Sequence, residues 1–386
     1  MNYFLTELQE MIRDICHKIG EEKIKPVRAR YDETQEFPWD VVKVLAETDI
    51  CGCYIPEEYG GMGGGIMEMV IATEELSRFC GGIALAFAAT GLGTYPILLF
   101  GTPEQKAKYL PDIAKGKKLA AFAITEANAG SDASGISTTA RKDGDSYILN
   151  GTKQWITNGG EAETYSVVAL TDKSKGGRGA SAFILEKGMP GFSFGKKEDK
   201  MGIRASATRE LVFEDCRVPK SQLLGREGMG FLVAMKTFDR TRPGVASQAV
   251  GIAQGALDEA LRYAHQRHQF GKPISSFQGI QFMLADMAMK VEASRAMVYA
   301  AARMIDAGEE KFSKESAMCK AFASDVAMEV TTNAVQILGG YGYMKEFPVE
   351  KMMRDAKITQ IYEGTNQIQR GVIASHMIKD LLSHKS

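Results

Sequence analysis

The stretch FQGIQFMLADMAMKVEASRAMVYAAARMIDAG, residues 277–308, decides the fold class of the C-terminal part of the chain. It has almost no residue that interrupts a helix, and apolar side chains recur in it with a period near 3.6, at Met283, Leu284, Met287, Val291 and Val298. Residues 244–268 and 314–340 share this pattern, with short connections between the three segments. Short connections favour antiparallel neighbours, so we predict a four-helix-bundle domain over 229–386.

The first part of the chain, residues 1–118, also has helical periodicity. It opens with an amphipathic segment over 1–20 and continues with apolar-periodic runs over 39–50, 65–79 and 102–116. In the last of these, Thr102 and Pro103 form the N-cap and first helical position that such a helix favours. We predict an N-terminal helical domain here.

The middle part, residues 119–228, changes period. Short β-branched and aromatic runs over 146–159, 163–172, 180–188 and 209–219 are bounded by Gly, Asp and Pro, without long helices between them. This pattern predicts a middle antiparallel β domain, built as a sandwich or a barrel. The fold class is therefore α+β and mainly helical.

Composition excludes several classes of protein. A formal net charge of -1 argues against a nucleic-acid binder, and 386 residues suggest two or three domains at about 150 residues each. No apolar run is expected to approach the roughly 18 residues of a membrane span. The N-terminus has acids among its apolar residues, unlike a signal or transit peptide. We expect a cytoplasmic protein with no targeting segment in this chain.

Cysteine and glycine patterns narrow the chemistry. The six cysteines form no CxxC pair and the histidines show no HExxH spacing, so neither a zinc site nor a disulfide framework is expected. Each cysteine is expected to be buried, with a role in packing. No GxGxxG opens a helix after a strand, and no GxxxxGK[ST] occurs, so neither a nicotinamide dinucleotide fold nor a P-loop is indicated.

Two stretches of the middle part are candidates for a binding wall. FAITEANAGSDASG, residues 122–135, is either an ordinary hairpin loop or a wall that a planar or anionic group approaches closely. KQWITNG, residues 153–159, places Trp155 and Thr157 close to a turn. Trp155 is either core or a cover for a ring.

Three stretches of the helical part have similar alternatives. QRHQFGKPI, residues 266–274, carries an arginine that either grips phosphate or is merely solvated. QILGGYG, residues 336–342, is either a helix C-cap or a close approach to a dinucleotide. FDRTRP, residues 238–243, is expected at a helix start, where Asp239 and Thr241 are N-capping residues on the simplest interpretation.

TQIYEGTNQIQRG, residues 359–371, sets an acid, Glu363, between a tyrosine and a glycine just before a predicted helix. Thr365 or Asn366 is expected to be the N-cap of that helix. A charged residue there is usually just solvated, so the position of this carboxylate requires an explanation from the rest of the chain.

Taken together, these stretches resemble the acyl-CoA dehydrogenase family over essentially the whole chain. The similarity is carried in the family's order by ITEANAGSDAS (124–134), LNGTKQWITNG (149–159), DKMGIRASATRELVFEDCRVP (199–219), the segment 238–274, QILGGYGY (336–343) and MRDAKITQIYEGTNQIQR (353–370). Several stretches resemble those of short- and medium-chain members, the butyryl-CoA type in particular, notably TDKSKG (171–176) and GKKEDKMGI (195–203).

The resemblance implies a function. Members bind FAD without a covalent link and usually form homotetramers. They oxidise a saturated acyl-CoA to the trans-2-enoyl-CoA and pass electrons to an electron-transfer flavoprotein. The base takes the α-proton, the flavin accepts the hydride, and the backbone amide of the base helps to stabilise the thioester oxygen. An apolar surrounding is expected to raise the pKa of that base.

The resemblance also implies roles for individual residues. Glu363 falls on the catalytic base. In isovaleryl-type relatives the base lies instead on the helix that contains 238–243, where this chain has Thr241, which cannot serve as one. Glu198 matches a residue that docks the electron-transfer partner. The positions that match FAD contacts are Phe122, Ile124, Thr125, Ser131, Trp155, Ile156, Thr157, Arg267, Gln269, Phe270, Gln278, Gln336, Gly339, Gly340, Thr365 and Gln367. Some of them contact the FAD across a subunit interface. The acyl-CoA positions are Ser131, Asp239, Arg242, Tyr362 and Gly364.

One departure from the family and three open alternatives remain. Ala127 stands where the family often has proline, which loosens a turn. The segment 82–101 resembles the lining of the acyl tail and is rich in small residues, so a medium-chain, branched or cyclic acyl group is an alternative substrate. Operation as an enoyl-CoA reductase, or a flavin-binding protein without enzymatic activity, are further alternatives. The sequence does not determine whether the chain joins a larger electron-bifurcating complex.

Overall fold

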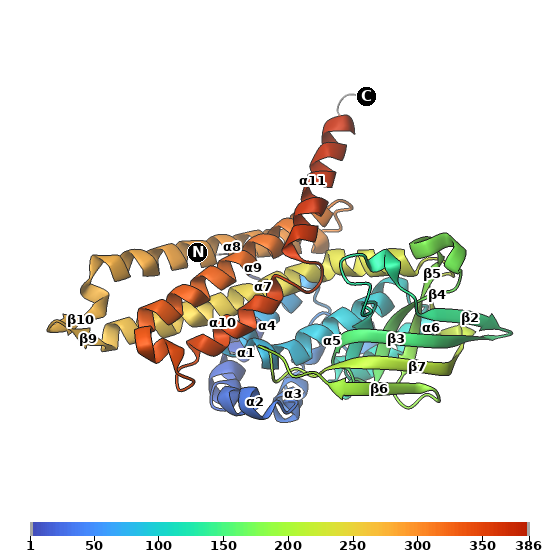
Figure 1. The fold of residues 1–386 in the computed structure, drawn as a ribbon, viewed down its shortest axis with the longest axis horizontal. Helices are drawn as coiled ribbons and strands as arrows, with labels where there is room; N and C mark the ends of the chain where they lie inside the picture. The colour runs from blue at the N-terminus through green and yellow to red at the C-terminus, as the bar shows by residue number, and fades with distance from the viewer. Residues whose placement is uncertain (1–2, 384–386) are drawn as a thin grey trace.

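The computed structural model describes residues 3–383, and its first part is helical (Figure 1). Its helices are α1 (Glu7–Ile19), α2 (Arg28–Thr34), α3 (Trp39–Glu47), α4 (Ile66–Phe79), α5 (Gly81–Phe100) and α6 (Pro103–Ala114). The amphipathic helix predicted within residues 1–20 is α1. Residues 1 and 2 of that predicted segment lie outside the described range. Thr102 caps α6 as predicted, because its side chain accepts a hydrogen bond from the Gln105 amide and Pro103 occupies the first turn.

The middle part forms one continuous sheet. Its strands are β1 (Ala120–Ala123), β2 (Thr139–Asp143), β3 (Ser146–Thr157), β4 (Thr164–Leu170), β5 (Ala180–Glu186), β6 (Phe192–Lys197), β7 (Thr208–Pro219) and β8 (Leu223–Leu224). The spatial order is β6-β7-β3-β2-β4-β5-β8, and β1 pairs with β4. Most neighbours are antiparallel, as predicted. The pairs β1–β4 and β2–β4 are parallel, since β3 lies between these strands in sequence and supplies the long connection that parallel pairing needs.

The last part returns to helix and packs as a bundle beside the sheet (Figure 1). Its elements are α7 (Gly230–Gln266), the short hairpin β9 (His268–Gln269) and β10 (Lys272–Pro273), α8 (Gln278–Asp306), α9 (Ser313–Leu338), α10 (Val349–Thr359) and α11 (Asn366–Ser383). The predicted mainly helical α+β fold is therefore confirmed. The six cysteines are buried, as expected.

The expectation that FDRTRP begins a helix was wrong, because this stretch lies inside the 37 residues of α7. Pro243 removes the amide that would bond the carbonyl of Asp239 one turn earlier. The hydroxyl of Ser316, on α9, donates to that carbonyl at 2.6 Å instead. A tertiary hydrogen bond thus replaces the missing helical one and lets α7 continue.

The expectation that no apolar run approaches the length of a membrane span was also wrong. Helix α5 is long and apolar enough by length and composition, but 72% of its apolar window is buried inside the protein. It packs against α4, α7 and β1, so its apolar residues form the junction of the three parts of the fold. The small residues that the sequence shows here serve close packing: a Cβ on Gly93 would lie 2.4 Å from the amide nitrogen of Ala121 on β1.

Helices α4 and α7 approach each other closely enough to exclude side chains at two positions. A Cβ on Gly251 would lie 2.1 Å from the carbonyl oxygen of Glu74, and one on Gly255 would lie 2.0 Å from that of Arg78. Since both obstacles are backbone atoms, they cannot rotate away. This contact holds the first helical part against the bundle.

We therefore expect Gly251→Ala to destabilise the protein by about 1–3 kcal/mol, because the helices must separate. Gly371→Ala is the matched control, since a Cβ on this helical glycine of α11 meets nothing within 4 Å. The control should be neutral or slightly stabilising. Thermal unfolding of both variants measures the difference, and equal melting temperatures would contradict this account of the α4–α7 contact.

Candidate active site

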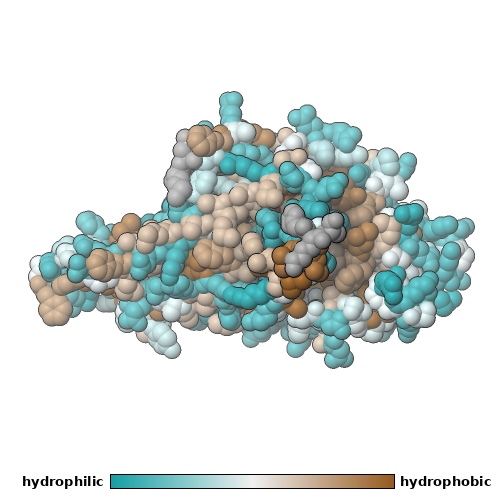
Figure 2. Space-filling view, turned by 90° about the horizontal axis from the view of Figure 1, so that it is seen from above, coloured by the Kyte–Doolittle hydropathy of each residue, from teal (hydrophilic) through white to brown (hydrophobic). Residues whose placement is uncertain are grey.

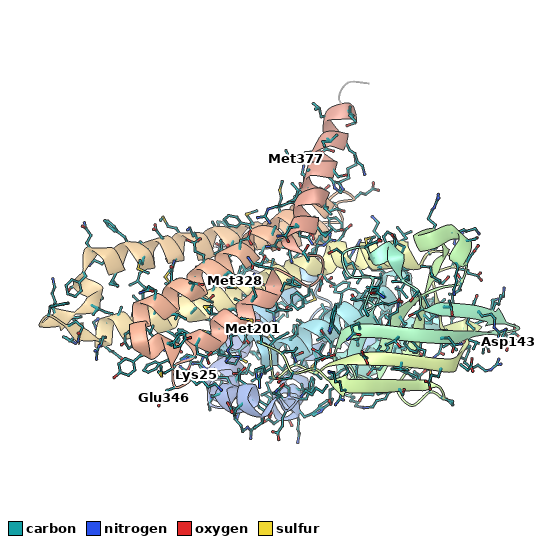
Figure 3. All side chains as sticks on the ribbon, in the orientation of Figure 1. Lys25, Asp143, Met201, Met328, Glu346 and Met377 are labelled. Carbon is teal, nitrogen blue, oxygen red and sulfur yellow. The ribbon has the colours of Figure 1, made fainter. Side chains whose placement is uncertain are left out.

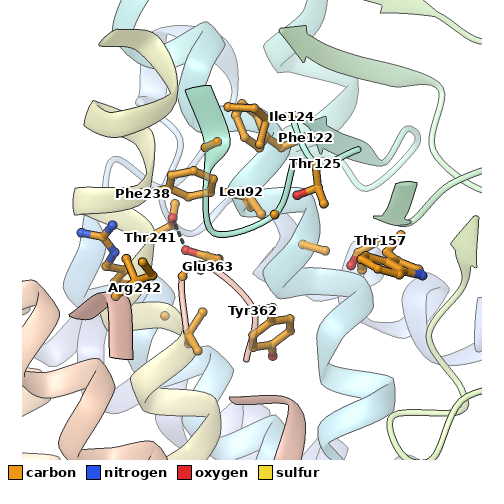
Figure 4. Close-up of a pocket in the computed structure, with 18 of the residues that line it drawn as sticks. Leu92, Phe122, Ile124, Thr125, Thr157, Phe238, Thr241, Arg242, Tyr362 and Glu363 are labelled. Carbon is orange, nitrogen blue, oxygen red and sulfur yellow. Dashed lines mark hydrogen bonds between the residues drawn. The ribbon is translucent and has the colours of Figure 1, made fainter. Parts of the chain in front are cut away.

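A cleft of about 340 Å³ opens where α5, α7, the start of the sheet and the α10–α11 connection meet (Figure 4). Its inner part is apolar. Among the polar groups that line it, Thr241 and Arg242 come from α7 and Glu363 from the connection, two segments far apart in sequence. An apolar pocket with a few convergent polar groups is the usual form of a small-molecule site.

The turn that carries Glu363 has an unusual backbone. Glu363 and Gly364 both have positive φ angles, 50° and 89°. The left-handed region costs a non-glycine residue about 1–2 kcal/mol, so surrounding contacts must hold Glu363 there. A side chain on Gly364 would be strained by this φ, and its Cβ would also lie 2.6 Å from Nε2 of the Gln369 side chain.

Several side chains supply those contacts. The amide of Gln369 donates to the carbonyls of Glu363 at 3.0 Å and Gly364 at 2.9 Å. The ammonium of Lys320, on α9, donates to the same Gly364 carbonyl at 2.8 Å. Thr365 accepts from the Ile368 amide and so caps α11, one of the two N-caps that the sequence predicted.

The carboxylate of Glu363 turns from this anchored backbone into the cleft. The hydroxyl of Thr241 donates to its Oε2 at 2.7 Å, the bond drawn dashed in Figure 4. Burial raises the pKa of Glu363 to about 7, although the Thr241 bond and the charges of Arg242 and Lys320 oppose that rise. Glu363 is thus poised to hold or release a proton near neutral pH.

Arg242 lies beside this carboxylate, and Asp239 holds it. The guanidinium donates to Asp239 at 2.9 Å, and Ser313 donates to the other oxygen of that acid at 2.6 Å. The Nε of Arg242 is buried and has no hydrogen-bond partner among the described residues. Asp239 does not line the cleft, whereas Arg242 does, so the arginine is the group of this pair that a ligand reaches.

The opposite wall of the cleft comes from the sheet and the loop after β1. It includes Phe122 from β1, Ile124, Thr125 and Ser131 from the loop, and Trp155, Ile156 and Thr157 from β3. Register shifts in the β3–β7 pairing bracket Gln154 and Trp155, which marks a bulge. Trp155 has a φ of 57° and a 57% exposed side chain, so it presents its ring to the cleft and is not core.

A second hollow lies at the other end of the bundle, beside the β9–β10 hairpin (Figure 1). Arg267, Gln269, Gly339 and Gly340 line it, so the structure brings these four predicted residues together. Gly339 has a φ of 60°, and a Cβ on either glycine would meet only open space. The three other predicted residues of this end, Phe270, Gln278 and Gln336, are exposed near it without lining it.

Comparisons with known proteins identify the family. Three family models cover the chain: the acyl-CoA dehydrogenase N-terminal domain matches residues 6–117, the middle domain 121–216 and the C-terminal domain 228–378. The chain belongs to the acyl-CoA dehydrogenase family. As in that family, it is an oxidoreductase with FAD as its cofactor.

Individual relatives of this acyl-CoA dehydrogenase agree over nearly the full length. The acryloyl-CoA reductase (NADH) of Anaerotignum propionicum is 50% identical over 98% of this chain and 96% of its own. The butyryl-CoA dehydrogenase structure of Megasphaera elsdenii is 50% identical, with a TM-score of 0.95 over 98% and 100% of the two chains. A chain from a structure described as the electron transferring flavoprotein of Acidaminococcus fermentans is 53% identical, with a TM-score of 0.95 over 98% and 99%.

The residues of this acyl-CoA dehydrogenase fit the flavin. Trp155 offers a large exposed aromatic face beside the cleft, and the hydroxyls of Thr125 and Thr157 line the same wall. The exposed arginine and glycines of the second hollow suit phosphate and a closely approaching nucleotide. Thr365 and Gln367 lie at the start of α11, next to the Glu363 turn.

Two segments of the cleft wall, the loop after β1 and strand β3, are joined by a buried ion pair that the sequence did not reveal. Lys153, on β3, is fully buried and donates to Glu126 at 2.7 Å and to the Ile124 carbonyl at 3.0 Å. Glu126 also accepts from Ser137 and from the Thr138 amide. Burial alone would raise the pKa of Glu126, but Lys153 and these hydrogen bonds lower it to about 2. The pair therefore fixes the loop after β1 against the strand that carries Trp155.

Sequence reasoning missed further residues around the turn. Three of them are Lys320, Gln369 and Gln248. Each lies within a predicted helix, and the composition around it gives no sign of a site. The one available signal was positional: a lysine in the sequence MCKAFA lies on the apolar face of a predicted helix, where charge is costly.

We expect Lys153→Met to lower the free energy of unfolding by about 3–5 kcal/mol, because it leaves a buried carboxylate without its cation. The same change should weaken FAD retention, since the wall loses its anchor. Lys43→Met is the control: its partner Glu47 is 3.9 Å away and both side chains are exposed. Melting temperature and bound flavin per chain measure both effects, and a Lys153→Met protein as stable as the control would refute this role.

Proposed function

We propose that this acyl-CoA dehydrogenase removes the α-proton of a short-chain acyl-CoA, of the butyryl-CoA kind, with Glu363 as the base. The observation that carries the proposal is the carboxylate of Glu363, placed at the wall of an apolar cleft with a pKa raised to about 7 by burial. A general base is most effective when its pKa lies near the working pH. Among the described residues that line the cleft, the other acid is Asp132, which is exposed and caps its own turn.

The residues of the chain have distinct parts in the reaction. Glu363 accepts the α-proton, and its own backbone amide, held by the anchored turn, stabilises the thioester oxygen as negative charge develops. Thr241 orients the carboxylate through its 2.7 Å hydrogen bond but transfers no proton to or from the substrate. Arg242, with Nε unpaired, and Ser131 bind the CoA arm. When bound, FAD accepts the hydride that leaves the β-carbon.

The floor of the cleft supports a short acyl chain. Gln248 lines the cleft, is almost fully buried, and donates to the carbonyl of Gly81 at 3.0 Å. Its carbonyl oxygen accepts a hydrogen bond from the Tyr362 hydroxyl. Both ends of this side chain are therefore held in place, so a long acyl tail cannot push it aside without breaking buried hydrogen bonds.

Glu363 does not set the direction of the reaction, which depends on the reduction potential of the electron partner. Operation as an enoyl-CoA reductase is a second candidate, favoured by the 50% identity to an acryloyl-CoA reductase. An electron-transfer flavoprotein is the proposed partner in either direction, with Glu198 at its docking surface. The Gln154 side chain donates to Glu198 at 3.4 Å, and the residue after Gln154, Trp155, is exposed. A cytoplasmic location accords with the bacterial relatives.

We also propose a homotetramer in which copies share the cofactor sites. The second hollow and the sheet that carries Trp155 lie at opposite ends of the molecule, so one FAD meets both groups only through a second copy (Figure 1). Apolar side chains also gather on α11, which projects from the bundle (Figures 2 and 3). Met377, Ile378, Leu381 and Leu382 are each more than half exposed, which is typical of a surface that another subunit covers.

Glu363→Gln is the direct test of the base. The amide keeps the shape of the side chain but cannot accept the proton, so we expect turnover with butyryl-CoA to fall by about 10²–10⁴-fold while bound flavin and melting temperature stay unchanged. Anaerobic bleaching of the flavin by butyryl-CoA should slow equally. Glu346→Gln, at an exposed glutamate, is the control. Full activity of the Glu363 variant would show that the base is elsewhere.

Gln248→Ala tests the short-chain preference. Removal of the side chain opens the floor, so the ratio of kcat/KM for hexanoyl-CoA over butyryl-CoA should rise about ten-fold or more. Gln254→Ala is matched on the same helix, where Gln254 bonds Asp258 and Arg295 and does not line the cleft. A wild-type optimum beyond six carbons would overturn the short-chain proposal without affecting the role of Glu363.

A further inference from the structure

Among residues 3–383, three lysines are buried, and they differ in their partners. Lys153 is bonded to the carboxylate of Glu126 at 2.7 Å, and Lys351 to that of Asp355 at 2.5 Å. Lys320 is fully buried as well, yet none of the ion pairs among residues 3–383 includes it. A buried ammonium without a contacting acid is costly, so its position requires a reason other than stability.

The hydrogen bonds of Lys320 all point to the catalytic turn. Its ammonium donates to the carbonyl of Gly364 at 2.8 Å and to the side-chain oxygen of Asn366 at 3.0 Å. Asn366 is in turn fixed to α9, because it donates to Ser324 at 2.8 Å and to Asp325 at 2.7 Å. Lys320 thus approaches the turn from α9, on the side away from the cleft, and reaches the residue directly after Glu363.

We infer that Lys320 is a positioning residue for Glu363: its ammonium anchors the Gly364 carbonyl from behind, holds the left-handed turn, and places a positive charge close to the carboxylate. This inference rests on the proposed role of Glu363 as the base. It explains why a lysine occupies the site, since a neutral donor would supply the hydrogen bonds but not the charge.

The charge has a direct consequence for the carboxylate. Burial dominates the pKa of both groups, raising that of Glu363 and lowering that of Lys320 to about 8, but each charge favours the ionised form of the other. The ionisable groups that face this pair from the packed elements are Asp239 and Arg242 on α7, Asp325 on α9, Arg370 on α11 and Asp132 on the cleft wall. Arg370 is paired with Asp325, and Arg242 with Asp239, so Lys320 is the cation of this group that lacks an acid of its own.

The sign of the effect follows. Glu363 must be ionised to accept a proton, so kcat/KM rises with pH through the pKa of Glu363. Loss of the Lys320 charge disfavours the carboxylate and moves this rise to higher pH. A nearby opposite charge favours the ionised form of a carboxyl, so we expect Lys320→Gln and Lys320→Met to move the midpoint upward, by up to about one pH unit.

The experiment compares Lys320→Gln, which retains a hydrogen-bond donor, Lys320→Met, which retains neither donor nor charge, and Lys320→Arg, which retains the charge. Lys314→Gln is the matched control on the same helix, at a lysine paired on the surface with Glu315 and Asp380. The midpoint is measured in two ways: from the pH dependence of kcat/KM, and from the infrared carboxylic-acid band that Glu363→Gln lacks. The glutamine and methionine variants should shift in both measurements, whereas the arginine variant and the control should stay near wild type.

An unshifted midpoint in a folded Lys320→Gln protein overturns the inference. If neither neutral variant folds, the kcat/KM profiles of wild type and Lys320→Arg are compared between pH 7 and 9: wild type should reach its plateau at a higher pH than the arginine variant, because Glu363 ionises less readily once Lys320 has lost its proton, and identical profiles overturn the inference. The proposed function is judged separately by Glu363→Gln. An active Glu363→Gln protein would refute the role of Glu363 as the base. An inactive Glu363→Gln protein, together with an unshifted midpoint in Lys320→Gln, would refute only the positioning role of Lys320.

Discussion

A carboxylate that is to serve as a base near neutral pH, as we propose for Glu363, must be shielded from water and still point at its target, and both conditions here depend on hydrogen bonds to the main chain of one turn. The carbonyls of Glu363 and Gly364 are bound by Gln369 and Lys320, so the backbone stays in a left-handed conformation that an unsupported glutamate would leave. With the backbone fixed from behind, the side chain is free to face the apolar cleft, where a single hydroxyl, that of Thr241, orients it.

The same division of labour recurs on the other side of the cleft. There the loop after β1 and the bulge of β3 carry the groups that suit a flavin, and the buried Lys153–Glu126 pair joins them behind the surface. Most side chains that face the cleft are small or apolar, with Glu363, Arg242 and the exposed Asp132 as the charged groups among them, while Lys320, Lys153 and Glu126 lie one layer deeper. Such an arrangement keeps the dielectric of the cleft low and still restrains the geometry, which are the conditions under which a raised carboxyl pKa and an aimed amide are most useful.

The helices set the distances between these parts. Close contact between α4 and α7, permitted by Gly251 and Gly255, presses the first helical part onto the bundle, and α5 fills the junction between helices and sheet. The long helix α7 passes through all of this because Ser316 satisfies the carbonyl that Pro243 leaves open. As a result Thr241 and Arg242, Glu363, and the loop after β1 meet at one cleft, although more than a hundred residues separate each from the next.

How much was visible in the sequence depends on whether the signal is local. The periods of the helical and β segments, the cap at Thr102, and the order of the family-like stretches are local patterns. They were enough to predict the fold class and the family, and to single out Glu363 as a candidate. The continuation of α7 through Pro243, the burial of α5, the parallel pairs of β4 and the partners of Lys320 and Lys153 have no local signature. Each depends on a group from a distant segment that satisfies a carbonyl, covers an apolar face or neutralises a charge, and such a partner exists only once the chain has folded.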